Sequence, residues 1–253
     1  MSPRTLDFYR GYLRRAGNVV GLDVGGEDIR CFLSGLSCSL GGQHAYYRSL
    51  RAFFNWLYSP SSGFGLKAWD NPILAVDPPK VDKKLLPALL QEQVTYLLDQ
   101  AANARDKAIV SLFCDSGLRL SELANIRACD VDWSRHLIKA TCKGNKEGLA
   151  AFGLRTEELL KQWLAIYNSN GGPIWGLKAR GIQAMLWRLE SKTGVKCNAH
   201  AIRRGFASIL SKRGVDSLHI MRLGRWECLA MVDRYTRSVQ FEDSLKHYSP
   251  IVS

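Results

Sequence analysis

Long apolar segments are absent from this 253-residue sequence. No run of eighteen apolar residues occurs, whereas a helix needs about 20 such residues to cross a bilayer. The first twenty residues contain Asp7 and four arginines, Arg4, Arg10, Arg14 and Arg15, where a secretory signal peptide carries an apolar region. The sequence therefore predicts a cytoplasmic protein with no membrane partner.

Disulfide and metal-binding patterns are also missing. The seven cysteines form no Cys-x-x-Cys pair and lie in segments with helix or strand patterns, which argues against a disulfide framework or a zinc site. The sequence contains no Walker phosphate-binding loop and no convincing carboxylate cluster, because Asp130 and Asp132 are typical of turn and strand-edge positions. We therefore expect reduced thiols, no metal and no cofactor.

Positive charge is what the sequence has in excess. The formal net charge is +12 and the isoelectric point is near 9.5. Residues 178–237 hold 13 Lys+Arg and 4 Asp+Glu, an excess of nine. Such a concentration predicts a polyanionic partner. Nucleic acid is favoured over a membrane surface, because the basic segments lack the strongly apolar opposite face of an interfacial helix.

Helical periodicity dominates the chain and predicts a mainly α protein with a small antiparallel β-element. Residues 71–87 contain four prolines and three lysines, which is typical of an extended linker. We expect a helical domain over 1–78, a linker over 79–88, and a second domain over 89–253 that ends in a tail, 238–253. In the second domain, helices are expected near 91–100, 104–116, 121–127, 155–168, 179–192, 199–213, 216–223 and 228–236, and strands at 136–142 and 147–153. Gly117 is placed to end the second of these helices and Ser121 to cap the third.

Two pairs of charged residues are candidates for chemistry. Arg119 lies between two leucines in a short connection that follows Gly117, so it is expected to be partly buried and to need an anion. That anion is either Glu122 alone, or a phosphate toward which Glu122 orients the guanidinium. His200 and Arg203 lie three residues apart at the edge of an apolar helix stripe. They are either solvated residues of an amphipathic helix or groups that project together into a site.

Trp226 and Tyr235 pose a geometric question. Nine residues at 100° each amount to 900°, so on one unbroken helix the two rings would point to opposite faces. If both belong to one site, the helix must begin after Trp226. Leu223-Gly224 is a suitable end for the preceding helix.

Taken together, these segments resemble the tyrosine recombinase, or phage integrase, family, with its Cre-like and Xer-like members. The resemblance lies in SGLRLSEL (116–123), CKGNKEG (142–148), AHAIRRGFASIL (199–210) and LGRWECLAMVDRYTR (223–237). It implies a helical, SAM-like core-binding domain followed by an α+β catalytic domain. It also implies an active site made of Arg119, Lys143, His200, Arg203, Trp226 and the nucleophile Tyr235, with Glu122 as accessory acid.

The resemblance implies a site-specific recombinase that cuts and rejoins DNA through a covalent 3′-phosphotyrosyl intermediate, during integration, excision or dimer resolution. The arginines would stabilise the charge on phosphorus, and Lys143 on a hairpin would protonate the leaving oxygen. Lys146 is a second candidate on that hairpin. The alternatives are a topoisomerase, a telomere resolvase, or a catalytically silent DNA-binding protein.

The partners implied are double-stranded DNA and three further copies of the chain, in a tetramer on two sites with exchange of the C-terminal tails, together with accessory proteins. The DNA partner also implies association with the nucleoid. DNA contacts are expected from basic residues in both domains and in the linker. They are Arg48, Arg51, Lys80, Lys83, Lys84, Lys146, Arg204 and Arg225.

Overall fold

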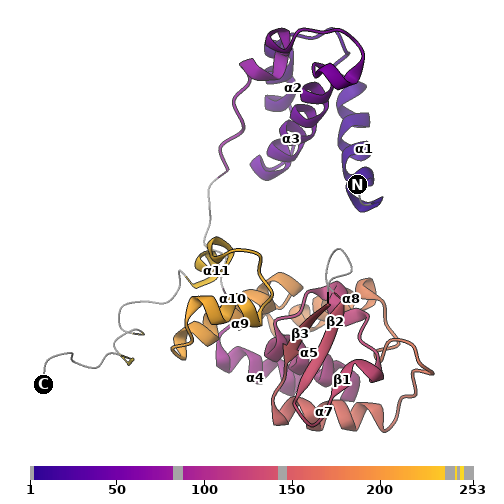
Figure 1. Ribbon diagram of the computed structural model, residues 1–253, viewed down its shortest axis with the longest axis vertical. Coiled ribbons are helices and arrows are strands. Elements are labelled where there is room, and N and C mark those ends of the chain that lie inside the picture. The colour runs from indigo at the N-terminus through magenta and orange to yellow at the C-terminus, as the bar shows by residue number, and fades with distance from the viewer. Residues whose placement is uncertain (1–2, 82–87, 142–146, 237–242, 244–245, 248–253) are drawn as a thin grey trace, which may run out of the picture. The chain divides into compact units, whose positions relative to one another are not determined.

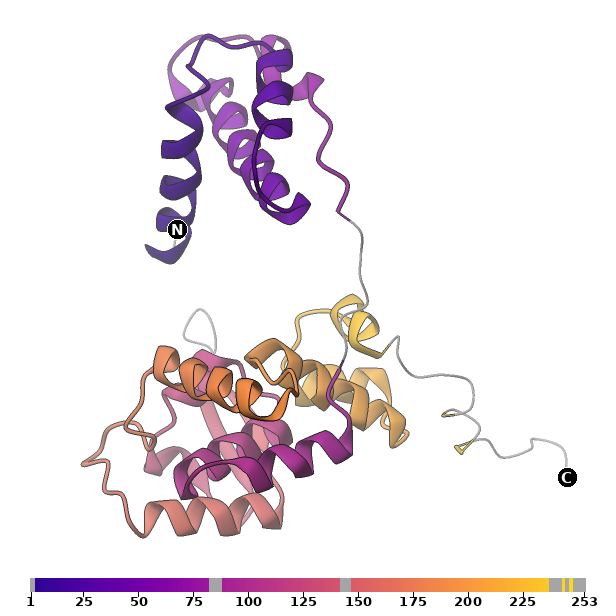
Figure 2. The same ribbon diagram turned by 180° about the vertical axis from the view of Figure 1, so that it is seen from behind.

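A computed structural model shows two compact units, Met1–Lys84 and Leu85–Ser253 (Figures 1 and 2). The structure describes residues 3–81, 88–141, 147–236, 243 and 246–247. Each unit has its own hydrophobic core, and the second unit adds a smaller cluster near its end. Within the described residues, no helix has the length and apolar character required to cross a membrane.

The first unit is a helical bundle. Its long helices α1 and α3 pack against each other, and α2 packs on α3. Tyr46, Leu50 and Phe54 of α3 bury one face of that helix against Ile29 and Phe32 of α2. The elements of this unit are α1 (Pro3–Gly17), α2 (Gly26–Ser34), α3 (Leu40–Leu57), and the 3-10 turns η1 (Pro60–Ser62), η2 (Ala68–Asp70) and η3 (Pro72–Ala75).

The second unit is built around a central helix, α5, which packs against α4, α7, α9 and strand β3. The core here includes Trp175, Phe113 and Leu160, which are fully buried. Its helices are α4 (Gln91–Gln100), α5 (Ala104–Ser116), α6 (Leu120–Ala124), η4 (Ala128–Asp130), α7 (Leu154–Leu164), α8 (Ala179–Thr193), α9 (Ala199–Lys212), α10 (Ser217–Leu223) and α11 (Leu229–Thr236).

A small antiparallel sheet lies beside α5, in the order β1-β2-β3 (Figure 1). The strands are β1 (Val131–Asp132), β2 (Leu137–Thr141) and β3 (Glu147–Ala151). In β2 and β3, Ile138 and Ala150 are paired and buried, while their neighbours along each strand are more exposed. This alternation is what a sheet with one covered face requires.

The predicted fold class, mainly helical with a small antiparallel β-element, is confirmed, and most predicted helices lie within a few residues of the observed ones. One prediction was wrong: Ser121 does not cap α6. Arg119 occupies the N-cap, and the Glu122 carboxylate accepts from its backbone N–H. No strand was predicted at β1, since its two residues are too few for a periodic signal.

Candidate functional site

A tight turn between α5 and α6 presents Arg119. Gly117 ends α5 in the left-handed region, with φ of +54°, as the sequence predicted. A Cβ atom at Gly117 would lie 2.6 Å from Cδ1 of Phe206 on α9. Glycine is therefore required both by the backbone conformation and by the close approach of α9.

Arg119 and Glu122 form a partly buried ion pair. Nη1 of Arg119 lies 2.8 Å from Oε1 of Glu122, whose side chain is only 2% exposed. Burial raises the pKa of Glu122, but the backbone and side-chain hydrogen bonds from Arg119 and the charges of Arg225 and Arg119 outweigh it, so the pKa is lowered overall. The Arg119 side chain keeps 33% exposure, so these contacts do not enclose it fully.

Arg203 reaches the same place from α9. It is 7% exposed, and its guanidinium donates to the carbonyl oxygens of Gly117 and, at 2.6 Å, Gly224. Burial and the nearby charges of Arg119 and Arg225 lower its pKa to about 10. An anion bound between these cations would therefore be strongly favoured, because it would relieve their mutual repulsion.

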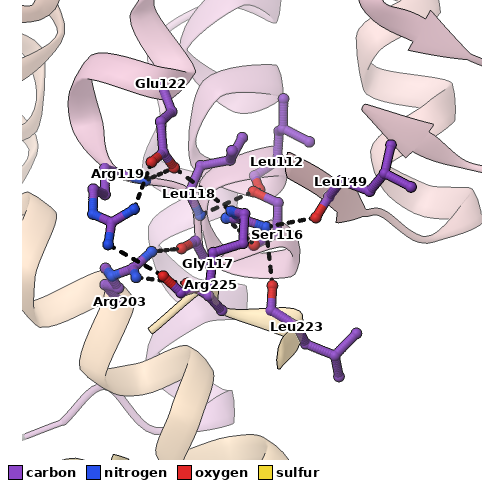
Figure 3. Close-up of polar contacts among 11 residues, drawn as sticks. Leu112, Ser116, Gly117, Leu118, Arg119, Glu122, Leu149, Arg203, Leu223 and Arg225 are labelled. Atoms are coloured by element: carbon purple, nitrogen blue, oxygen red, sulfur yellow. Dashed lines mark hydrogen bonds and ion pairs between the residues drawn. The ribbon is translucent and has the colours of Figure 1, made fainter. Parts of the chain in front are cut away.

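Arg119 and Arg203 both donate hydrogen bonds to the backbone just before Trp226. Nη2 of Arg119 donates to the carbonyl of Arg225 at 3.2 Å, and Nη2 of Arg203 donates to the preceding carbonyl, that of Gly224 (Figure 3). The turn after α5, helix α9 and the loop between α10 and α11 are thereby joined by two guanidinium groups.

Trp226 lies at the centre of the site and is 5% exposed. The Arg203 guanidinium carbon lies 4.4 Å from the centre of the indole ring system, a distance typical of a cation–π contact. The Tyr235 ring centre is 5.6 Å away. Gly224 makes this position possible, since a Cβ atom there would lie 2.0 Å from Cζ3 of Trp226.

Tyr235 is carried by α11, and Trp226 by the loop before it. Helix α10 ends at Leu223 and α11 begins at Leu229, so the predicted break after Trp226 is confirmed. The two rings, which one continuous helix would have separated, meet in a small cluster with Phe206, Ile220 and Val232.

The remaining predicted catalytic residues are placed differently. His200, in the first turn of α9, is exposed, and no contact connects its side chain to the arginines in the described structure. Lys143 and Lys146 lie outside the described residues, between the ends of β2 and β3. The contribution of the hairpin lysines therefore stays a prediction.

The predicted DNA contacts fall into three groups. Arg48 and Arg51 on α3, and Lys80, are exposed, as phosphate contacts require. Lys83 and Lys84 lie outside the described residues. Arg204 and Arg225 differ from the expectation, because Arg204 is only 8% exposed and the Arg225 side chain is 9% exposed.

Sequence reasoning missed two features of this site. Arg225 directs its guanidinium inward, to backbone carbonyls of other elements, and Gly224 is the residue over which the Trp226 ring lies. The partners of Arg225 are 76 and 109 residues away, so no local pattern could have identified them. The Leu-Gly ending of α10 was a signal for Gly224, but only for its role in helix termination.

Residues 87–241 match the family model for the phage integrase family. The chain belongs to this family, that of the tyrosine recombinases. It is 30% identical over 269 residues to tyrosine recombinase XerC of Shewanella amazonensis, with 98% of this chain and 89% of that protein covered. It is 29% identical over 213 residues to XerC of Syntrophus aciditrophicus, of which it spans 66%, slightly less than two thirds.

Solved structures of tyrosine recombinases share the fold. A lambda integrase dimer bound to a COC′ core site matches with a TM-score of 0.77 at 13% identity, covering all of this chain and 76% of that one. XerH bound to difH in a pre-cleavage complex matches with a TM-score of 0.71 at 17% identity, covering 96% and 78%. At these identities the likeness concerns the fold of the tyrosine recombinases.

Proposed function

We propose that the protein is a site-specific DNA recombinase whose Tyr235 attacks a DNA phosphodiester and forms a 3′-phosphotyrosyl bond. The observation that carries the proposal is the contact of the Tyr235 ring with Trp226. The indole of Trp226 also contacts the guanidinium of Arg203, which donates to two backbone carbonyls. A tyrosine next to a buried cation cluster is suited to attack on a phosphate. Family membership supports the same activity.

In this mechanism the phenolic oxygen of Tyr235 forms a bond to phosphorus and the 5′ oxygen of the next nucleotide leaves. Negative charge on the non-bridging oxygens is stabilised by Arg119 and Arg203, since guanidinium groups offer paired donors that lysine does not. His200 assists as base and Lys143 protonates the leaving oxygen. The phosphotyrosyl bond conserves the energy of the broken ester, and attack by a 5′ hydroxyl reseals the strand.

DNA binding is proposed for both units, with residues 1–78 as the core-binding domain, 79–88 as linker and 89–253 as the catalytic domain. The exposed arginines Arg48 and Arg51 on α3 support contact with phosphates. The neighbouring structures include lambda integrase bound to a COC′ core site and XerH bound to difH. From the family resemblance we propose a tetramer on two sites, with exchange of the tail 238–253.

A nicked suicide duplex tests the proposal. The DNA is first selected from a random library by its binding to the protein, and a nick close to the cleaved bond then lets the released oligonucleotide diffuse away and traps the intermediate. The wild type is expected to form an adduct that survives denaturant, and Tyr235→Phe none. Tight, site-specific binding without an adduct would instead indicate a catalytically silent DNA-binding protein.

A further inference from the structure

Arg225 lies beside the proposed site, but no step of the proposed mechanism uses its side chain. It precedes Trp226 and has a φ of +55°, in the left-handed region. A residue with a Cβ adopts this conformation only where the surroundings hold it there. The side chain is 9% exposed, although the residue lies in a loop of a strongly basic segment.

The guanidinium of Arg225 contacts three different elements. Nη1 donates to the carbonyls of Leu149 in β3 and Leu223 at the end of α10, both at 2.9 Å, and Nη2 donates to the carbonyl of Ser116 at the end of α5, at 3.2 Å. Nε lies 3.7 Å from Oε2 of Glu122. Figure 3 shows the side chain among these groups.

Each of these elements leads to a residue of the proposed site. Ser116 precedes the turn that presents Arg119, and Glu122 is the ion-pair partner of Arg119. Strand β3 follows the segment that contains Lys143. The backbone carbonyl of Arg225 itself accepts from Arg119, and the next residue is Trp226.

We infer that Arg225 is a positioning residue that fixes the Arg119 turn, strand β3 and the Trp226 loop relative to one another for the cleavage step. It is a positioning and not a catalytic residue in this proposal, because its backbone carbonyl accepts from Arg119 and its side chain reaches Glu122 and the carbonyls of the neighbouring elements. The inference rests on the proposed function. A planar guanidinium with five donors suits three carbonyls in different directions, whereas the single ammonium of lysine does not.

Cleavage of the suicide duplex at saturating protein provides the first test, because it separates the reaction from binding. Misplacement of catalytic groups by about 1 Å costs on the order of 100-fold in rate, so Arg225→Ala is expected to cleave about 100-fold more slowly than the wild type. Arg225→Lys, which keeps the charge beside Glu122, is expected to recover only a small part of the rate. Arg222→Ala is the matched control, since Arg222 is exposed in the last turn of α10.

Arg225→Gly is a second variant that controls for a folding defect in Arg225→Ala. Glycine suits a positive φ, so this variant removes the side-chain contacts while it relieves the backbone. It is expected to fold and still to cleave slowly. A rate for Arg225→Gly equal to that of the wild type would overturn the inference, as would a loss of rate in Arg225→Ala that a higher protein concentration restores.

Hydrogen exchange of the free protein provides a second test that needs no activity. Peptides covering 117–124 and 222–227 are expected to exchange faster in Arg225→Ala than in wild type, while peptides of α8 stay unchanged. Unchanged exchange in the first two peptides overturns the inference. Faster exchange with an unchanged cleavage rate also overturns it, because Arg225 then only stabilises the loop. If the wild type itself forms no adduct, the proposed function fails, and exchange alone decides whether Arg225 holds these segments.

Discussion

The guanidinium of Arg203 stacks on the indole of Trp226, 4.4 Å from its centre, and donates to the carbonyl of Gly224, two residues earlier. One side chain of α9 therefore holds both the ring and the backbone of the loop that precedes the proposed nucleophile. This arrangement makes Arg203 both a phosphate ligand in the proposed reaction and a support for Trp226.

Arg203→Lys is expected to lower the cleavage rate at saturating protein by at least about 100-fold, since one lost transition-state donor costs about that much. Lysine keeps the charge but cannot donate to Gly117, Gly224 and a phosphate with fixed geometry. Arg188→Lys, the same change at an exposed position on α8, is the control. A rate for Arg203→Lys within a few-fold of the wild type would contradict the assignment.

A double-mutant cycle tests the packing of Gly224 under Trp226. Gly224→Ala is expected to destabilise the protein by about 2 kcal/mol through overpacking, because the added Cβ meets Cζ3, Cε3 and Cη2 of the indole. Histidine lacks these atoms, so Gly224→Ala should cost less in a Trp226→His background. The free energy of unfolding of all four proteins measures the coupling. Additive effects would show that the indole is not over Gly224.

Glu122 makes part of the stability depend on pH. Its pKa is lower in the folded protein than the ordinary value of 4.5, so its contribution is full above about 4.5 and is lost as pH falls through the folded pKa. Glu122→Gln is expected to reduce the free energy of unfolding by about 2 kcal/mol at pH 7, and this difference should shrink below pH 4.5.

Urea unfolding of both proteins between pH 7 and pH 3 measures that difference. Glu92→Gln removes a carboxylate at an exposed position of α4 and controls for the change in net charge. A difference between wild type and Glu122→Gln that stays constant over this range would mean that the ion pair with Arg119 does not hold the carboxylate ionised.

The break between α10 and α11 is a feature of the site that could be predicted from the sequence. The 900° rotation between Trp226 and Tyr235 predicted a loop on the condition that the two residues share a site, and the rings do meet. The direction of the Arg225 side chain could not be predicted in this way, because its carbonyl partners are distant in the sequence. Likewise Ser121 is a good N-cap residue by type, but the Arg119–Glu122 pair places the N-cap of α6 two residues earlier.

Binding to DNA is expected to depend steeply on salt. With several Lys and Arg residues on phosphates, the logarithm of the affinity should fall linearly with the logarithm of the salt concentration, by about 0.9 per phosphate contact. Arg51→Ala removes an exposed charge on α3 and should reduce the slope by about 1. Fluorescence anisotropy titrations at several salt concentrations measure both. A nearly flat slope for the wild type would contradict binding through phosphates by both units.

The central claim is that Tyr235 itself becomes linked to DNA. After reaction with the suicide duplex and exhaustive nuclease digestion, cleavage at glutamates gives the peptide 228–242, in which Tyr235 is the only tyrosine. Fragmentation by mass spectrometry is predicted to locate a nucleotide phosphate on Tyr235, with the modified peptide absent from Tyr235→Phe. A nucleotide adduct on any other residue, or the same adduct yield from Tyr235→Phe, would contradict the account.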